Sequence, residues 1–318
     1  MTDMIVQTSI LINDNKTMLD VCGVNNRNIR RIESLTDIAI EASGEEIILS
    51  GNDFELVELL INNLIDISKN NGMIYTNLID LMVSELKHDS STNFNDMINS
   101  SINIVKANKV FNPRTVAQGQ YINLLNKKDV VLAYGPAGTG KTFLSICYAV
   151  NQLLNKEVEK IVITRPIVEA GESLGFLPGD YIQKINPYLI PLFDSLNQIV
   201  SQEMYLKLTA KNAIEIAPLA YMRGRTFENA IVILDEAQNT TCSQMKMFLT
   251  RLGNGAKLII NGDITQIDLP YRVKSGMVDA LSVLRGIEEI GFMEFSEKDV
   301  VRHPIVKKII SAYNKNGN

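Results

Sequence analysis

Residues 130–143 read VVLAYGPAGTGKTF and carry the clearest fold signal in the chain. Four apolar residues, typical of a buried strand, are followed by small and turn-forming residues and then by an apolar-rich segment. Residues 135–142 match G-x-x-x-x-G-K-[ST], in which backbone N–H groups curl around a phosphate at the start of a helix. The stretch therefore predicts a strand, a phosphate-binding loop and a helix.

Each type of residue in this loop is predicted to have its own role in binding a nucleotide. Glycines let the backbone approach an anion without a clash at Cβ. The Lys141 ammonium can reach the β- and γ-phosphates, and the Thr142 hydroxyl can bind Mg²⁺. We expect a nucleotide to contact Gly135, Pro136, Ala137, Gly138, Thr139, Gly140, Lys141, Thr142 and Phe143. A glycine-rich turn without a ligand is the alternative, and the loop alone does not distinguish a kinase, a hydrolase or a switch.

The segment NAIVILDEAQN, residues 229–239, carries a second motif, in which an apolar run ends in two acidic residues. Asp235 suits the position from which a neighbouring strand supplies a carboxylate for Mg²⁺. Glu236 follows it and has the chemistry of a general base that polarises water for attack on the γ-phosphate. A solvated strand terminus is the alternative, and the phosphate loop upstream favours the functional interpretation.

Two further segments carry side chains suited to the same site. KLIINGDITQID, residues 257–268, follows another apolar run with polar side chains. Asn261, Asp263 or Gln266 could hold the attacking water or sense the γ-phosphate, and a polar turn is the alternative. Gln118 lies one helix before the phosphate loop; its amide can bind adenine as donor and acceptor, or it is exposed helix surface.

Short apolar runs that alternate with helix-like segments set the fold class as α/β. Beyond residue 113 these runs predict strands at 130–134, 161–164, 213–217, 231–235, 257–261 and 291–295. The pattern predicts a parallel sheet covered by helices on both faces. Ligands bind such sheets beyond the carboxyl ends of the strands, which is where the motifs fall.

The rest of the chain suggests a smaller unit and a connection. Residues 1–70 predict a small α/β domain, and residues 71–112 predict a helix followed by a polar linker rich in serine and asparagine. Residues 113–318 then form the main domain. The three cysteines share no metal-ligand spacing, which argues against a zinc site or a disulfide framework. Without a signal peptide or an apolar span in the sequence, we expect a cytoplasmic protein with no membrane partner.

These motifs, in this order, resemble the PhoH-like family of bacterial phosphate-starvation-inducible ATPases. The resemblance covers roughly residues 110–315. It rests on the phosphate loop and on long blocks that include ITRPIVEAGESLGFLPGD (163–180), IEIAPLAYMRGRTFENAIVILDEAQNTT (214–241), GDITQIDLP (262–270) and DVVRHPIV (299–306). It implies a RecA-like P-loop NTPase core related to helicases, with a small N-terminal KH-like domain.

The resemblance also implies roles for single residues. Lys141 and Thr142 match the residues that bind ATP and Mg²⁺, and Asp235 with Glu236 matches the Walker B pair. Gln266 falls in a motif that resembles a helicase γ-phosphate sensor. Gln118 falls where such ATPases carry an adenine-reading glutamine. Two departures, Arg114 in place of lysine and Asn261 in place of a small hydroxyl residue, make the resemblance less close there.

The family is linked with RNA metabolism, so RNA is the expected partner. A ribonuclease or a ribosome-associated protein is a further candidate. In the KH-like unit, GVNNRNIRRIE (23–33) resembles the nucleic-acid-facing segment but lacks the G-x-x-G of a KH domain. Arg27, Arg30 and Arg31 could contact phosphates there, or form a solvated helix face.

Only one RecA-like core is visible, so a second charge-stabilising group must come from elsewhere. An arginine supplied by a neighbouring subunit is the simplest source. The candidates for this role are Arg223, Arg225, Arg251 and Arg302. An arginine acting from a neighbouring subunit predicts a homo-oligomer such as a hexameric ring. The alternative is that each is an ordinary surface or ion-paired arginine. Arg165, after the strand at 161–164, could touch RNA or brace the γ-phosphate region.

The sequence thus favours a Mg²⁺-dependent ATP hydrolase that acts in RNA metabolism by remodelling RNA or an RNA–protein complex, with helicase activity as one form of that remodelling. Two alternatives stay open. The first is a phosphotransferase, although an acidic side chain next to Asp235 favours water as the acceptor. The second is a nucleotide-gated module that binds RNA or protein and hydrolyses slowly.

Overall fold

A computed structural model describes residues 6–69, 74–90, 92, 94, 100–167, 181–301, 305 and 309. The chain divides into two compact units, of which the first comprises residues 1–100 and 113–119. The second comprises residues 101–112 and 120–318. Each unit contains its own cluster of buried apolar side chains.

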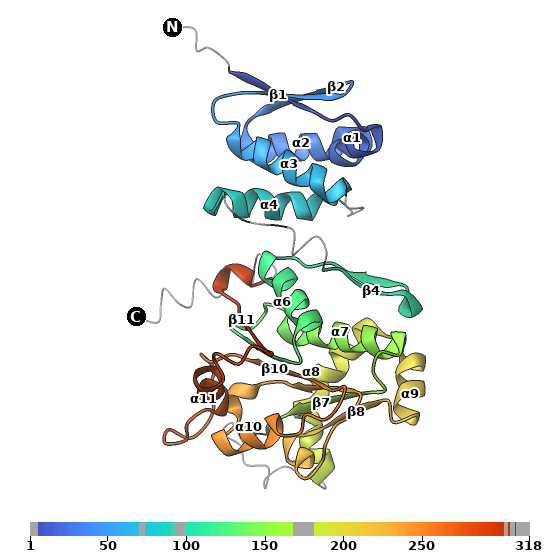
Figure 1. Ribbon diagram of the computed structural model, residues 1–318, viewed down its shortest axis with the longest axis vertical. Coiled ribbons are helices and arrows are strands. Elements are labelled where there is room, and N and C mark those ends of the chain that lie inside the picture. Colours follow the sequence, from blue (N-terminus) through green and yellow to red (C-terminus); the bar gives the residue numbers. More distant parts are fainter. Residues whose placement is uncertain are drawn as a thin grey trace. The chain divides into compact units, whose positions relative to one another are not determined.

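The first unit is an α/β layer structure. Its strands pair antiparallel in the order β1-β3-β2, and helices pack against one face of this sheet (Figure 1). Its elements are β1 (Gln7–Leu11), α1 (Asn15–Cys22), η1 (Val24–Asn26), α2 (Arg27–Thr36), β2 (Ala39–Ser43), β3 (Glu46–Ser50), α3 (Glu55–Lys69) and α4 (Thr76–His88). Alternate strand residues such as Ile47 and Leu49 are buried beneath the helices, as a sheet with one covered face requires.

A short hairpin lies within the segment expected to be a linker. Strands β4 (Ile102–Ile104) and β5 (Lys109–Phe111) pair antiparallel and belong to the second unit. The Phe111 ring meets the ring of Phe143 edge-on, with centroids 5.4 Å apart. The hairpin therefore packs against the helix that follows the phosphate loop, and residues 101–112 are part of a folded domain.

The second unit is built on a six-stranded sheet whose strands are all parallel. The strand order is β11-β6-β10-β9-β7-β8. The strands are β6 (Val130–Tyr134), β7 (Lys160–Arg165), β8 (Ile214–Pro218), β9 (Ala230–Leu234), β10 (Lys257–Gly262) and β11 (Ile290–Glu294). All six match the apolar runs in the sequence within one residue, which confirms the predicted α/β fold.

Helices cover both faces of this sheet (Figure 1). They are α6 (Val116–Lys127), α7 (Lys141–Asn155), α8 (Tyr181–Ile199), α9 (Gln202–Ala210), α10 (Cys242–Leu249) and α11 (Gly276–Val283), with short 3-10 turns η2 (Val105–Ala107), η4 (Leu219–Met222), η5 (Ala237–Asn239) and η6 (Glu297–Asp299). Met245 and Phe248 of α10 and Met277 of α11 join the apolar cluster on one face. Every residue of β6 and β9 is buried, because both faces of the sheet are covered.

The carboxyl ends of the neighbouring strands β6, β10 and β9 lie within two residues of one another in register. Ala133 of β6 pairs with Asn261 of β10, and Ile260 of β10 pairs with Leu234 of β9. The loops that follow these strands therefore meet at one edge of the sheet, as expected for a ligand site. In the part of the chain that the structure describes, no helix is both long and apolar enough to cross a membrane.

Candidate active site

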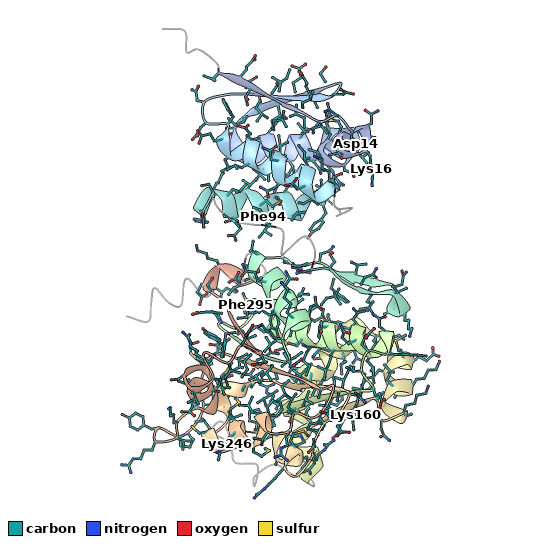
Figure 2. All side chains as sticks on the ribbon, viewed as in Figure 1. Asp14, Lys16, Phe94, Lys160, Lys246 and Phe295 are labelled. Carbon is teal, nitrogen blue, oxygen red and sulfur yellow. The ribbon has the colours of Figure 1, made fainter. Side chains whose placement is uncertain are left out.

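The phosphate loop connects β6 to α7 at the carboxyl edge of the sheet. Gly135, Gly138 and Gly140 have φ angles of 137°, 88° and 85°, which side chains with a Cβ rarely adopt. A Cβ at Gly135 would lie 2.2 Å from the carbonyl oxygen of Phe295, the residue after β11 labelled in Figure 2. The loop can follow this path only with glycine at that position.

The Lys141 ammonium lies within the curl of the loop. It donates hydrogen bonds to the carbonyl oxygens of Gly135 (2.7 Å) and Pro136 (2.8 Å) and to the Thr139 hydroxyl (3.1 Å). Burial lowers the pKa of this ammonium, and the negative charges of Asp263, Asp235 and Glu236 oppose that shift. The loop thus holds a cation where its amides converge at the start of α7.

The hydroxyl after this lysine contacts the first acidic residue of the second motif. Thr142 Oγ1 donates to Asp235 Oδ1 at 2.6 Å. Asp235 follows β9 and is 6% exposed. Burial raises the pKa of its carboxyl, whereas the hydrogen bond from Thr142 lowers it. The two side chains predicted to bind Mg²⁺, from sequence positions 93 apart, are thus in direct contact.

Glu236 is held from two sides at the edge of the site. Its backbone is left-handed, with φ 52°, a conformation that costs a residue other than glycine about 1 kcal/mol and occurs often at functional sites. One carboxylate oxygen lies 3.1 Å from Nη2 of Arg165, at the end of β7. The other accepts a 2.6 Å hydrogen bond from Nε2 of Gln238. The carboxylate therefore has a fixed orientation.

Gln238 connects this carboxylate to the third strand end. The side chain is 1% exposed; its Nε2 also donates to the Gln266 carbonyl oxygen at 3.1 Å, and its Oε1 accepts from the Asp263 N–H at 3.0 Å. A Cβ at Gly262 would lie 2.8 Å from that Oε1, so the packing around the amide is tight. One buried amide therefore ties the second motif to the third.

These groups surround one cavity of about 300 Å³. Its lining residues are Ala137, Gly138, Gly140, Lys141, Thr142, Phe143, Ser195, Asp235, Glu236, Gly262, Asp263 and Gln266. Among the described residues, nothing donates to the buried Oδ2 of Asp263. The lining combines one cation and many loop amides with three carboxylates, a set suited to a phosphate accompanied by a hard cation.

Other candidate residues lie elsewhere in the fold. Asn261 is 1% exposed and bonds to Tyr121 and Ser145 on the far side of the strand, so the structure gives it a packing role. Gln118 belongs to the first unit, where its side chain accepts from the N–H of Arg114. Its adenine-reading role stays a prediction.

The candidate arginines are mostly held by their own chain. Arg251 donates to the carbonyl oxygens of Met247 (2.9 Å) and Arg225 (2.8 Å). Arg225 itself forms a two-bond ion pair with Glu215. Arg223 is exposed, and Arg302 lies outside the described residues.

In the first unit, the candidate phosphate-contacting arginines differ in their surroundings. Arg31 pairs with Asp80 of α4, whereas Arg27 and Arg30 are exposed.

Sequence reasoning missed three residues of the site. Gln238 is the last letter of DEAQ, and its position two residues after Glu236 was the available signal. Phe295 packs against the phosphate loop, and the centre of its ring lies 5.9 Å from the Lys141 ammonium. Ser195 reaches the cavity from α8, and no local pattern marks it.

A parallel six-stranded sheet with this loop and acidic pair at its edge defines a P-loop NTPase. The sequence profile of the PhoH-like protein family matches residues 110–314. A PhoH-like protein of Bacillus subtilis is 44% identical over 299 residues, covering 93% of this chain and 94% of its own length. A PhoH-like protein of Mycobacterium bovis is 41% identical over 298 residues, covering 93% of this chain and 84% of its own length.

A third relative, Protein PhoH of Escherichia coli, is 47% identical over 203 residues, or 63% of this chain and 57% of its own length. That match is shorter than the other two. The chain belongs to the PhoH-like family, whose members are P-loop ATPase-type proteins.

Proposed function

We propose that this chain hydrolyses ATP in the presence of Mg²⁺ and couples hydrolysis to RNA metabolism. The observation that carries the proposal is the 2.6 Å contact between Thr142 and Asp235, with Glu236 oriented beside it. A phosphate loop alone would bind nucleotide. The added pair of acidic residues supplies a metal-binding carboxylate and a separate base.

In this proposal the phosphate loop binds the triphosphate of ATP. Loop amides at the start of α7 face the phosphate oxygens, and the ammonium of Lys141 exchanges its bonds to Gly135 and Pro136 for bonds to the β- and γ-phosphates. The exchange is favourable because a charge-assisted bond to phosphate is stronger than a bond to a neutral carbonyl.

Residues of the site fit a magnesium ion. The Thr142 hydroxyl and the Asp235 carboxylate would hold it, and both are the hard oxygen ligands that Mg²⁺ prefers. Groups of three or more acidic, histidine or cysteine side chains suited to a metal do not occur among the described residues. Magnesium ions in such sites are commonly held by one or two carboxylates together with substrate phosphates and water. When bound, Mg²⁺ neutralises charge on the phosphates.

Glu236 accepts the proton of the attacking water in this proposal. Arg165 and Gln238 fix the direction of its carboxylate, and Gln266 lines the cavity close by. With one contact on each oxygen, the carboxylate still has lone pairs that can accept a hydrogen bond from water. The acid–base contribution of such a residue is about 10²- to 10⁴-fold in rate.

The coupling to RNA rests on the family resemblance and on local charge. Arg27 and Arg30 are exposed at the start of α2 and would meet an RNA backbone from the first unit. We also propose a homo-oligomer, such as a hexameric ring, in which Arg251 or Arg302 completes a neighbouring site. A cytoplasmic location is part of the same proposal, because ATP and RNA are both available there.

The test is product analysis on the purified protein. We expect ADP and free phosphate in the presence of Mg²⁺, no turnover after chelation with EDTA, and a faster rate with RNA of suitable sequence. Phosphate recovered on another acceptor would show a phosphotransferase instead. Very slow turnover combined with RNA binding that depends on ATP would show a nucleotide-gated module. Light scattering on the same samples measures the subunit number.

A further inference from the structure

The loop between β10 and α11, residues 263–275, projects away from the sheet beside α11 (Figure 1). Its outermost part is a turn in which the N–H of Val273 donates to the carbonyl oxygen of Pro270 at 2.8 Å. Tyr271 and Arg272 occupy the two central positions of this turn, and both are exposed. The relative exposure of Tyr271 is 104%, the highest among the large apolar and aromatic residues that the structure describes.

The base of this loop is fixed to the active site. Asn239 and Asp268 exchange two hydrogen bonds: Asn239 Nδ2 donates to Asp268 Oδ2 at 3.1 Å, and the Asp268 N–H donates to Asn239 Oδ1 at 2.8 Å. Gln238 binds the loop at Gln266 and binds Glu236 with the same nitrogen. A change in the position of Glu236 therefore displaces bonds that anchor the loop.

The chemistry of the turn fits a nucleic acid base and its phosphate. An aromatic ring that is fully open to solvent can stack on a base, and an adjacent guanidinium can bind phosphate or stack in turn. Among the described residues, Arg272 pairs with no acidic side chain, whereas Lys274 pairs with Asp279. The Arg272 guanidinium at the exposed tip is therefore available for a phosphate.

The size of the tip favours a strand of RNA over a protein partner. A stable protein interface buries about 800 Å² on each partner. One tyrosine and one arginine at a turn offer much less, and the aliphatic side chains of the same loop, Ile264, Ile267 and Val273, are only 36–40% exposed. Stacking on a single base needs only one ring.

We propose that Tyr271 and Arg272 bind single-stranded RNA, the ring stacking on a base and the guanidinium contacting phosphate. The assignment rests on the proposed function and names the residues through which the ATPase core contacts its substrate. Because the loop is anchored through Gln238, its affinity for RNA differs between the ATP-bound and the ADP-bound protein.

Tryptophan fluorescence gives a direct test, because the chain contains no tryptophan. The Tyr271→Trp variant carries a single reporter at the tip, and Tyr221→Trp, at another exposed tyrosine, is the matched control. We expect a short oligouridine RNA to quench the emission at position 271 and to leave that at position 221 unchanged. The extent of quenching should differ between ADP and a non-hydrolysable ATP analogue.

Truncation of the ring provides the second measurement. Tyr271→Ala should weaken binding of the oligouridine about 10- to 100-fold, the range for loss of one stacked base, with an unchanged melting temperature because the side chain touches no core. RNA affinity equal to that of the wild type overturns the inference. A lower oligomer mass with RNA affinity intact also overturns it and marks the turn as a contact with a second copy of the chain.

The outcomes separate this inference from the proposed function. If the wild-type protein hydrolyses ATP and binds RNA but the tip variants behave like the wild type, only the inference fails. If the wild-type protein binds no RNA in any nucleotide state, the RNA part of the proposed function fails and the inference fails with it.

Discussion

Replacement of Gln238 by methionine tests how the base is oriented. Methionine has nearly the same length and shape but forms none of the three hydrogen bonds of the amide. The bond to the charged Glu236 is worth about 1.5–3 kcal/mol. If that bond serves to aim the base, its loss lowers kcat about 10- to 100-fold. KM for ATP should stay near the wild-type value, because Lys141 and Thr142 are untouched.

The same substitution also affects stability. It leaves the buried N–H of Asp263 without its acceptor, which costs about 1–3 kcal/mol. Binding of a fluorescent ATP analogue checks that the variant is folded. Gln202→Met, at an exposed glutamine on α9, is the control and should change neither parameter.

The assay is steady-state phosphate release across a range of ATP concentrations. A kcat within twofold of the wild type would refute the orienting role of Gln238. A rise in KM as large as the predicted fall in kcat, with kcat itself unchanged, would show instead that Gln238 shapes the nucleotide pocket. Either result would also remove the basis for the proposed nucleotide dependence of RNA binding by the loop at residues 263–275.

Three further predictions follow from single contacts. Gly135→Ala should cost more than about 2 kcal/mol in unfolding free energy, because its Cβ would lie 2.2 Å from the Phe295 carbonyl oxygen; a urea midpoint equal to that of the wild type would contradict this. The hydrogen bond from Arg225 lowers the pKa of Glu215 from 4.5 to about 2, so its carboxylate stabilises the fold fully above pH 4.5 and loses that effect as the pH falls towards 2. After discounting for partial exposure, Glu215→Gln should cost about 1–2 kcal/mol near neutral pH and less at about pH 3, and a cost that is constant over this range would refute the ion pair's contribution. Tyr121→Phe should lower the unfolding free energy by about 1–2 kcal/mol, because the buried hydroxyl bonds to Asn261; an unchanged thermal transition would show that this bond contributes nothing.

The sheet and the nucleotide site were predictable because their signals are local. A buried parallel strand is a continuous apolar run, and the observed Lys160–Arg165 extends the predicted strand at 161–164 by only one residue at each end. The phosphate loop and Asp235 each lie directly after such a run. The parallel topology then brings these loops to one edge without further information.

What the sequence did not reveal depends on contacts between distant residues. Strands β4 and β5 have three residues each, too few for an alternating pattern to be distinct. The Asn261 side chain faces helices α6 and α7, because successive residues of a strand point to opposite faces. Its position directly before Gly262 made it look like part of the site. The role of Gln238 requires knowing that three strand ends surround it.

The central claim is that this edge of the sheet binds ATP and uses Glu236 to activate water. Single-turnover release of phosphate from γ-labelled ATP, with Mg²⁺ present, tests it most directly in the Glu236→Gln variant. We predict a rate at least about 100-fold below that of the wild type, with ATP affinity retained through Lys141. Phosphate release at the wild-type rate in this variant would contradict the claim.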